Sequence, residues 1–294
     1  MIENKIDLST LSKVGIMRQK QDDLFVMRLR AVGGDVTAEQ LLKISEVAKK
    51  YGNGFVHLST RQGIEIHYVH YDNLEKARLE LEDACVAMGA CGPRVRVIVA
   101  CPGDATCQWG IIETKEIAKD LDAKYFKQET PSKFKMAVTG CTHNCTKANE
   151  NDIGVRGAIL PKWIKSDCGD CSVCVCACPT SAIERIENET DGTYSYVSID
   201  EKCINCSVCT TICPSSSWFA ETKGFSLYVG GTMGKIPRFA SLLKKLITSK
   251  EELYELIERS LKYYQENGRK KERFGHMIDR IGFEKVREEI LNGV

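Results

Sequence analysis

The sequence predicts an α+β protein interrupted by a cysteine-rich insertion. Strand and helix patterns follow one another in the order β-α-β-β-α between residues 23 and 89. Residues 163–217 are instead dense in cysteine and poor in regular periodicity, and strand and helix patterns resume after them. We therefore expect four parts, which are residues 1–75, 76–162, 163–217 and 218–294.

The N-terminal elements follow from periodicity and capping residues. DLFVMRLRA predicts a strand, and the helix after it has a capping box at Thr37 and Gln40 and a stop at Gly52. Alternation in FVHLSTRQGIEIHYV predicts one or two strands with Arg61 at a turn, and residues 72–89 predict a second amphipathic helix. This order of elements is close to that of one ferredoxin-like subdomain.

Later strands lead directly into cysteine loops. RVRVIVA predicts a strand before one loop, and KFKMAV predicts a strand before another, with a helix over residues 112–125 between them. FSLYVGGTMGKIPR predicts a strand and a glycine turn, and residues 249–268 a helix capped by Ser249 with Glu252. Rigid sheet edges can therefore hold these loops around a large cofactor.

Fifteen cysteines in a chain of 294 residues indicate metal binding rather than disulfides. Two blocks match C-x2-C-x2-C-x3-C-P, the bacterial ferredoxin pattern, in which the fourth cysteine binds the other block's cluster. Zinc is disfavoured because its sites usually lack the third thiolate and the C-P ending. One [4Fe-4S] cluster would take Cys168, Cys171, Cys174 and Cys213, and the other Cys203, Cys206, Cys209 and Cys178.

A third cysteine set has the different spacing C-x5-C and C-x3-C. It consists of Cys101, Cys107, Cys141 and Cys145. With its flanking residues, CPGDATC and CTHNC, it resembles the sirohaem-dependent sulfite and nitrite reductases. The resemblance implies that these cysteines bind a [4Fe-4S] cluster and that Cys145 also bridges to the sirohaem iron. The expected cofactors are therefore sirohaem and three [4Fe-4S] clusters.

Basic residues occur in pairs two apart on three predicted strands, so each pair shares a sheet face. Arginine offers fixed charge and forked donors for an oxyanion, whereas a lysine near other cations can have its pKa lowered enough to pass a proton. The alternative is a solvated sheet face. The resemblance implies two arginines and two lysines at the substrate, and the motifs STRQG, VRVIVAC and KFK match Arg61, Arg96, Lys133 and Lys135.

Sirohaem carries eight carboxylates, so the resemblance also implies cations near its rim. The cationic candidates are Arg28, Arg30, Arg94, Lys235 and Arg238, and Gly231 is a further cofactor-binding candidate because the resemblance places its segment against the cofactor. The three arginines on the first strands have the alternative of facing water.

The resemblance implies an overall architecture and an activity. It is closest to small anaerobic-type sulfite reductase catalytic subunits: a ferredoxin-like subdomain at 1–75, a sirohaem and [4Fe-4S] domain at 76–162 and 218–294, and an inserted two-cluster ferredoxin at 163–217. The expected reaction is the six-electron reduction of sulfite to sulfide. Nitrite reduction to ammonia and a non-catalytic polyferredoxin-like carrier are the alternatives.

Partners and location follow from what the sequence contains. A ferredoxin or an NADH-oxidising partner subunit is the expected electron donor, because no G-x-G-x-x-G or P-loop motif occurs. Many members of the family have two homologous halves, whereas the pattern occurs once here, which leaves a homodimer, a hetero-oligomer and a minimal single-half reductase open. A net charge of +1 argues against nucleic acid, and the absence of a signal peptide or long apolar run indicates a cytoplasmic protein away from membranes.

Overall fold

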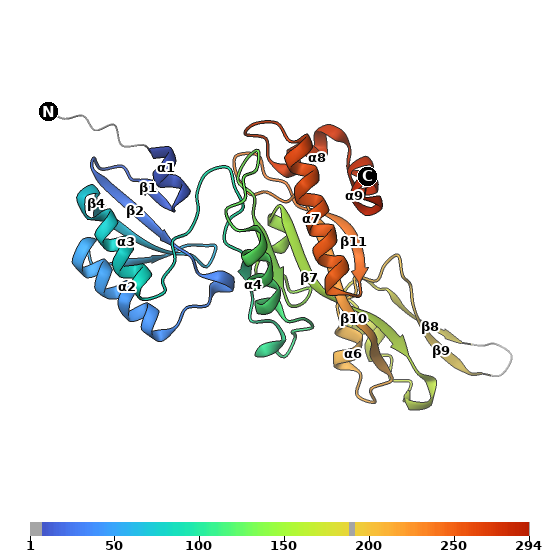
Figure 1. Cartoon of the computed structure of the whole chain (residues 1–294). Helices are drawn as coiled ribbons and strands as arrows, with labels where there is room; N and C mark the ends of the chain where they lie inside the picture. The colour runs from blue at the N-terminus through green and yellow to red at the C-terminus, as the bar shows by residue number, and fades with distance from the viewer. Residues whose placement is uncertain (1–7, 188–191, 294) are drawn as a thin grey trace.

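The molecule consists of a four-stranded antiparallel sheet, a five-stranded mixed sheet, the helices that pack on them, and a protruding module (Figure 1). The computed structural model describes residues 8–187 and 192–293. We call residues 8–88 the N-terminal unit, residues 89–163 with 218–293 the second unit, and residues 164–187 with 192–217 the module. The module projects from the end of the second unit that lies away from the N-terminal unit (Figure 1).

The N-terminal unit is a four-stranded antiparallel sheet covered by helices, in the order β1-β2-β4-β3. Its elements are α1 (Leu8–Lys13), β1 (Ile16–Arg18), β2 (Leu24–Leu29), α2 (Ala38–Tyr51), β3 (Val56–Leu58), β4 (Ile64–His70) and α3 (Leu74–Asp83). The predicted β-α-β-β-α order is confirmed over β2 to α3, and the capping box of Thr37 with Gln40 begins α2. The core of this unit continues to Met88, past the boundary expected at residue 75.

The second unit contains a five-stranded sheet in the order β11-β10-β7-β6-β5. The strands β5, β6 and β7 are parallel, whereas β7, β10 and β11 are antiparallel. Its elements are β5 (Val99–Ala100), α4 (Thr114–Tyr125), β6 (Met136–Thr139), β7 (Ile153–Trp163), β10 (Trp218–Val229), β11 (Ser241–Ile247), α7 (Lys250–Asn267), α8 (Phe274–Ile281) and α9 (Phe283–Asn292). Ser249 caps α7 as expected.

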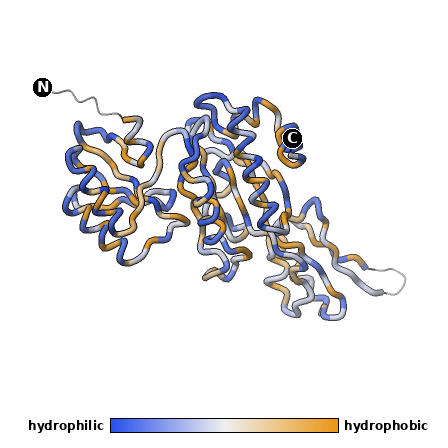
Figure 2. Tube along the Cα trace, in the orientation of Figure 1, coloured by the Kyte–Doolittle hydropathy of each residue, from blue (hydrophilic) through white to orange (hydrophobic). Residues whose placement is uncertain are grey.

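Helices α4, α7, α8 and α9 share one hydrophobic core with the second sheet. Phe134, Tyr264 and Phe274 form a fully buried aromatic group at its centre. Hydrophobic and hydrophilic residues alternate along the helices, as expected of helices that pack by one face (Figure 2). Short 3-10 helices lie at Val32–Gly34, Tyr71–Asn73, Gly103–Ala105, Ala148–Glu150 and Lys165–Asp167.

The module leaves the sheet between its two longest strands. Trp163 at the end of β7 pairs with Trp218 at the start of β10, so both ends of the module meet at one point. The module contains α5 (Val173–Ala177), β8 (Ile183–Glu187), β9 (Tyr194–Ser198) and α6 (Val208–Ile212). Its small core includes Cys174, Cys209 and Trp218.

Two expected strands are shorter than predicted. Only Val99–Ala100 of RVRVIVA is a strand, with isolated bridges at Arg94 and Val95, and β6 begins at Met136 rather than at Lys133. The backbone of residues 94–96 still pairs with Phe134, so the two segments run side by side. No helix in the described ranges is both long enough and apolar enough to cross a membrane.

Candidate active site and cysteine clusters

A cavity of about 280 Å³ lies between the N-terminal unit and the second unit, and it brings together the four cations predicted to face the substrate. Arg61 enters it from the turn between β3 and β4. Arg96, Lys133 and Lys135 enter it from the paired segments before β5 and β6. Phe134 and Met136 are fully buried, so the predicted alternation of KFKMAV is confirmed. The described lining also includes Arg28 and Glu65.

The turn that carries Arg61 is fixed against the second unit. Ser59 and Gly63 close the turn by a 2.8 Å backbone hydrogen bond. The Gln62 side chain donates to the Ala100 carbonyl at 2.8 Å and accepts from the Ala100 N–H at 3.0 Å. Because Ala100 directly precedes Cys101, this pairing joins the Arg61 turn to the first cysteine loop.

Both arginines are held by backbone carbonyls. The Arg61 guanidinium donates to the carbonyls of Val97 and Met136 and to the side chain of Asn151. Arg96 donates to the carbonyls of Ala90 (2.7 Å) and Gly92 (3.0 Å), while its buried Nε has no partner in the described structure. Burial lowers the pKa of Arg61 to about 10, and the charge of Arg96 acts in the same direction. Carbonyl partners do not neutralise these positive charges, and neither arginine forms an ion pair within the described residues, which favours an anion in the cavity.

The two lysines have lowered pKa values. Burial, together with the charges of Arg61 and Lys133, lowers the pKa of Lys135 to about 8. Burial also lowers the pKa of Lys133, with a further contribution from the charge of Arg273. Neither ammonium makes an ion pair within residues 8–187 and 192–293. A half-buried lysine with a pKa near 8 is suited to proton transfer at neutral pH.

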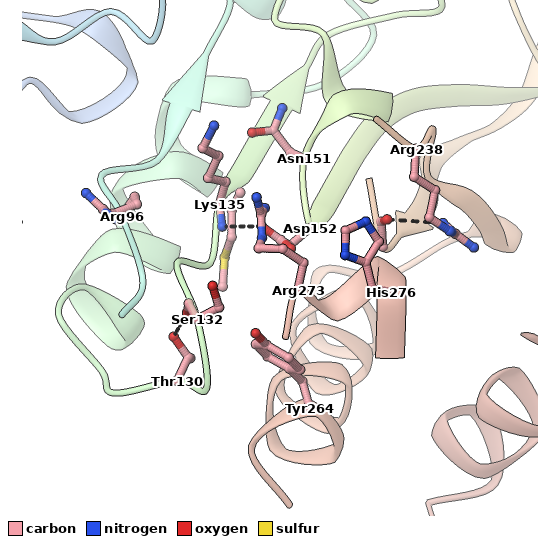
Figure 3. A network of polar contacts seen from close by, with 12 residues as sticks. Arg96, Thr130, Ser132, Lys135, Asn151, Asp152, Arg238, Tyr264, Arg273 and His276 are labelled. Atoms are coloured by element: carbon pink, nitrogen blue, oxygen red, sulfur yellow. Dashed lines mark hydrogen bonds and ion pairs between the residues drawn. The ribbon is translucent and has the colours of Figure 1, made fainter. Parts of the chain in front are cut away.

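A buried ion pair behind the lysines was not predicted from the sequence. Asp152 is fully buried and binds Arg273, at the start of α8, at 2.6 Å. Asp152 also accepts the backbone N–H of Lys135 at 2.9 Å (Figure 3). The neighbouring Asn151 accepts a hydrogen bond from Arg61, so two consecutive residues contact an arginine and a lysine of the cavity. The sequence does show an aspartate directly before the apolar run of β7, but its partner Arg273 lies 121 residues away and could not be identified from local patterns.

The structure separates the arginines predicted to bind the cofactor carboxylates. Arg28 lines the cavity and pairs with Glu65 at 2.7 Å. Arg30 instead donates from its Nε to the carboxylate of the buried Asp122 at 2.8 Å, and its guanidinium stacks over the Phe126 ring. Since β2 ends at Leu29, the alternation that should place Arg30 beside Arg28 does not continue.

Arg94 also lies outside the cavity lining, contrary to the expectation for a cofactor contact. It is buried, donates to the Cys91 carbonyl at 3.2 Å and pairs with Glu129 at 3.4 Å. Arg30 and Arg94 are therefore engaged in contacts within the protein, away from the cavity lining.

The three candidates after β10 differ from one another. Gly231 is buried, and a Cβ there would lie 2.5 Å from the Asn149 carbonyl oxygen. Arg238 binds Asp279 at 2.8 Å, Ser241 at 3.0 Å and two carbonyls, which uses its donors within the protein. Lys235 is exposed in the loop before Arg238 and remains a candidate.

The cysteines of the C-x5-C and C-x3-C motifs converge below the cavity strands. Burial raises the pKa of Cys141, and the charges of Cys101, Cys107 and Cys145 raise it further. Gly140 donates its N–H to Cys101 Sγ at 3.0 Å, and a His143 ring nitrogen lies 3.3 Å from Cys141 Sγ, with Trp109 packed on the imidazole. Four mutually repelling thiolates fit a cationic iron-sulfur core that compensates their charge.

The module brings together one complete predicted set of four cysteines. Cys178, Cys203, Cys206 and Cys209 line one small cavity. Burial, together with the charges of the other three, raises the pKa of Cys209 to about 12. The cross-over from Cys178 to the second block is therefore present in the geometry.

The other set meets around Trp218. Cys174 interacts with Cys171 and with the Trp218 side chain. Although burial acts against it, hydrogen bonds from the Trp218 backbone and from Ser215 lower the pKa of Cys213 to about 7. Cys168 packs against the same small core. In the described ranges, no three His, Cys, Asp or Glu side chains are arranged for a single metal ion.

Family descriptions match both units. The "Nitrite and sulphite reductase 4Fe-4S domain" matches residues 91–293, and the "Nitrite/Sulfite reductase ferredoxin-like half domain" matches residues 17–84. The chain is similar to the coenzyme F420-dependent sulfite reductase of Methanocaldococcus jannaschii, with 33% identity over 279 residues. That match covers 94% of this chain and 44% of the relative, so the chain spans less than half of its length.

Two further similarities agree with these. One subunit of the anaerobic sulfite reductase of Salmonella typhimurium is 28% identical over 290 residues, covering 92% of this chain and 84% of that relative. The crystal structure of dissimilatory sulfite reductase I superposes with a TM-score of 0.74 at 23% identity, covering 91% of this chain and 69% of that one. The latter is a likeness of fold.

Proposed function

The chain belongs to the nitrite and sulfite reductase family, and from this premise we propose that it reduces sulfite to sulfide. In this reaction sulfite takes up six electrons and six protons and yields sulfide and three waters. The observation that carries the proposal is the cavity in which Arg61, Arg96, Lys133 and Lys135 meet.

The arginines would hold the oxyanion. Both guanidinium groups are positioned by backbone carbonyls, which fix their orientation without neutralising them. Fixed donors of this kind bind a small anion without reorganising, and they stabilise negative charge in a partly buried site.

The lysines would supply protons as oxygen leaves as water. Lys135 has a pKa of about 8, so it is largely protonated at neutral pH and gives up its proton readily. Lys133 lies beside it on the same face, and its lowered pKa suits it to the same role.

The cofactor set follows from the family and the cysteine geometry. When bound, sirohaem supplies an iron that binds the substrate and receives electrons through a cluster. Cys101, Cys107, Cys141 and Cys145 would hold that cluster, and Cys145 would also be the ligand shared with the sirohaem iron. Arg28 and Lys235 are our candidates for the sirohaem carboxylates, because Arg28 lines the cavity, where it pairs with Glu65, and Lys235 is exposed.

We assign the module as an inserted two-cluster ferredoxin domain. Its support is the doubled cysteine motif together with the shared cavity of Cys178 and the second block. A ferredoxin or an NADH-oxidising partner subunit would deliver the electrons, in the cytoplasm, to a homodimer or a hetero-oligomer.

The first test is the cofactor content of protein purified without oxygen. Extraction with acidified solvent should give the isobacteriochlorin absorption spectrum of sirohaem. A protein with full iron and sulfide content but no sirohaem would instead be an electron carrier. Steady-state kinetics with sulfite and with nitrite, under the same anaerobic conditions, then decide between sulfide and ammonia as the product.

A further inference from the structure

The two cysteine sets of the module occupy different positions relative to the second unit. We propose that the set of Cys178, Cys203, Cys206 and Cys209 is the inner one, that Asn205 docks it on β7, and that electrons reach the second unit through it. The set of Cys168, Cys171, Cys174 and Cys213 is then the outer one, where the donor binds. This inference rests on the proposed two-cluster function of the module.

Asn205 is the contact between the inner set and the sheet. It is 3% exposed, and its side-chain amide donates to the Ile159 carbonyl at 2.6 Å. The Ile159 N–H donates in return to the Asn205 carbonyl at 3.1 Å. The Asn205 backbone N–H points to Cys203 Sγ at 3.4 Å. One residue therefore joins a cluster ligand to β7.

From Ile159 a short path continues to the cysteines of the second unit. Gly157 lies two residues earlier on β7, roughly 7 Å away along the strand. A Cβ on Gly157 would lie 2.1 Å from the Gly140 carbonyl oxygen, so the two backbones are in direct contact. Gly140 in turn donates to Cys101 Sγ. Backbone contacts thus connect Cys203 to Cys101.

The outer set lies further along the same strand. Trp218, which contacts Cys174 and Cys213, pairs with Trp163 of β7. Trp163 is six residues beyond Gly157, which corresponds to roughly 20 Å of strand. Along β7 the cysteines of the second unit therefore come first, the inner set second and the outer set last.

The equivalent residue of the outer set supports this order. Asp170 occupies the position of Asn205 in its own C-x2-C loop, and both residues have a left-handed φ, +50° and +55°. Asp170 binds Arg185 and Tyr196 within the module, and its side chain is 30% exposed. The charged Asp170 therefore lies at a position that water reaches, and the neutral Asn205 amide lies at the buried contact, because burying a charge costs more free energy than burying an amide.

Each transfer along this path moves one electron and forms or breaks no bond. A one-electron reductant, such as a ferredoxin-type protein or reduced methyl viologen, is oxidised by one electron as the outer set is reduced. The same electron then passes to the inner set and to the second unit.

Pulsed EPR on the anaerobically purified holoenzyme tests the order without turnover. Cys171→Ser removes the outer cluster and Cys206→Ser the inner one. We expect stronger dipolar coupling between the remaining module cluster and the second-unit cluster in Cys171→Ser. The reverse order overturns this inference alone. Absence of both module signals from the unmodified protein overturns it together with the two-cluster module.

A matched pair of variants tests Asn205 in rapid mixing with reduced methyl viologen. Asn205→Asp adds charge at the buried contact, and it should slow electron arrival at the second unit about tenfold or more, with reduction of the module unchanged. Asp170→Asn should leave that second phase unaltered. If Asn205→Asp does not fold, Asn205→Ser removes only the amide contact and should show the same slow phase. Equal slowing by the Asn205 and Asp170 variants refutes the role.

Discussion

Asp152 and Arg273 form a buried ion pair, 2.6 Å between Oδ2 and Nη2, behind the segment before β6 that carries Lys135. The pair connects three elements, because Asp152 directly precedes β7, Arg273 precedes α8, and the Lys135 N–H binds the same carboxylate. Its carboxylate is the nearby negative charge that opposes the lowering of the pKa of Lys133, Lys135 and Arg61.

Asp152→Asn should destabilise the protein. Loss of the carboxylate leaves the Arg273 charge buried and uncompensated, which costs about 3–5 kcal/mol in the free energy of unfolding. Denaturation with urea under anaerobic conditions measures the loss. Glu258→Gln is the control, because its pair with Lys124 is exposed and contributes no more than about 1 kcal/mol. Equal losses in the two variants would contradict the buried pair's role.

Sulfite turnover should fall as the pH rises through the pKa of Lys135, about 8. Only the ammonium form donates a proton, and it is lost above that pH. Lys135→Ala should keep its cofactors and slow turnover by about 10²–10⁴-fold. Lys162→Ala, at an exposed pair with Glu221, is the control. Normal turnover in a cofactor-replete Lys135→Ala protein would remove Lys135 from the mechanism.

The pH at which turnover falls should also shift in Asp152→Asn. The Asp152 charge raises the pKa of Lys135, so its removal lowers that pKa and shifts the fall in turnover to lower pH. The measurement is turnover against pH with the folded fraction held constant. An unshifted fall in turnover would show that another group controls it.

Cys145→Ser should abolish the magnetic coupling between the sirohaem iron and its cluster. The thiolate is the proposed bridge, and a serine oxygen is a poor substitute for it. Mössbauer or EPR spectroscopy of the anaerobic protein detects the coupling. Persistent coupling would disprove the bridge.

Gly157→Ala should destabilise the protein and lower its iron and sulfide content. The added Cβ would meet the Gly140 carbonyl oxygen at 2.1 Å, and backbone must move to relieve it. Overpacking of this kind typically costs about 1–3 kcal/mol. Thermal unfolding and metal analysis measure both effects. At Gly234 an added Cβ meets nothing within 4 Å, so Gly234→Ala should resemble the unmodified protein.

Local sequence patterns determined much of the architecture. The capping box at Thr37 and the alternation around Phe134 depend on residues within a few positions of each other, and both are present in the structure. The cysteine spacings also anticipated the grouping of Cys178 with the second block, because the motif itself encodes that cross-over.

Tertiary structure alone decided which of the paired arginines line the cavity. Arg30 and Arg94 have the same local pattern as Arg28 and Arg96, yet they lie outside the cavity lining, where Asp122 and Glu129 bind them from other segments. Asp152 meets Arg273 across 121 residues, and Asn205 and Asp170 occupy the same motif position but meet different partners, Ile159 of β7 and Arg185 of the module. Periodicity fixes which face a side chain takes, whereas its partner depends on how distant elements pack against that face.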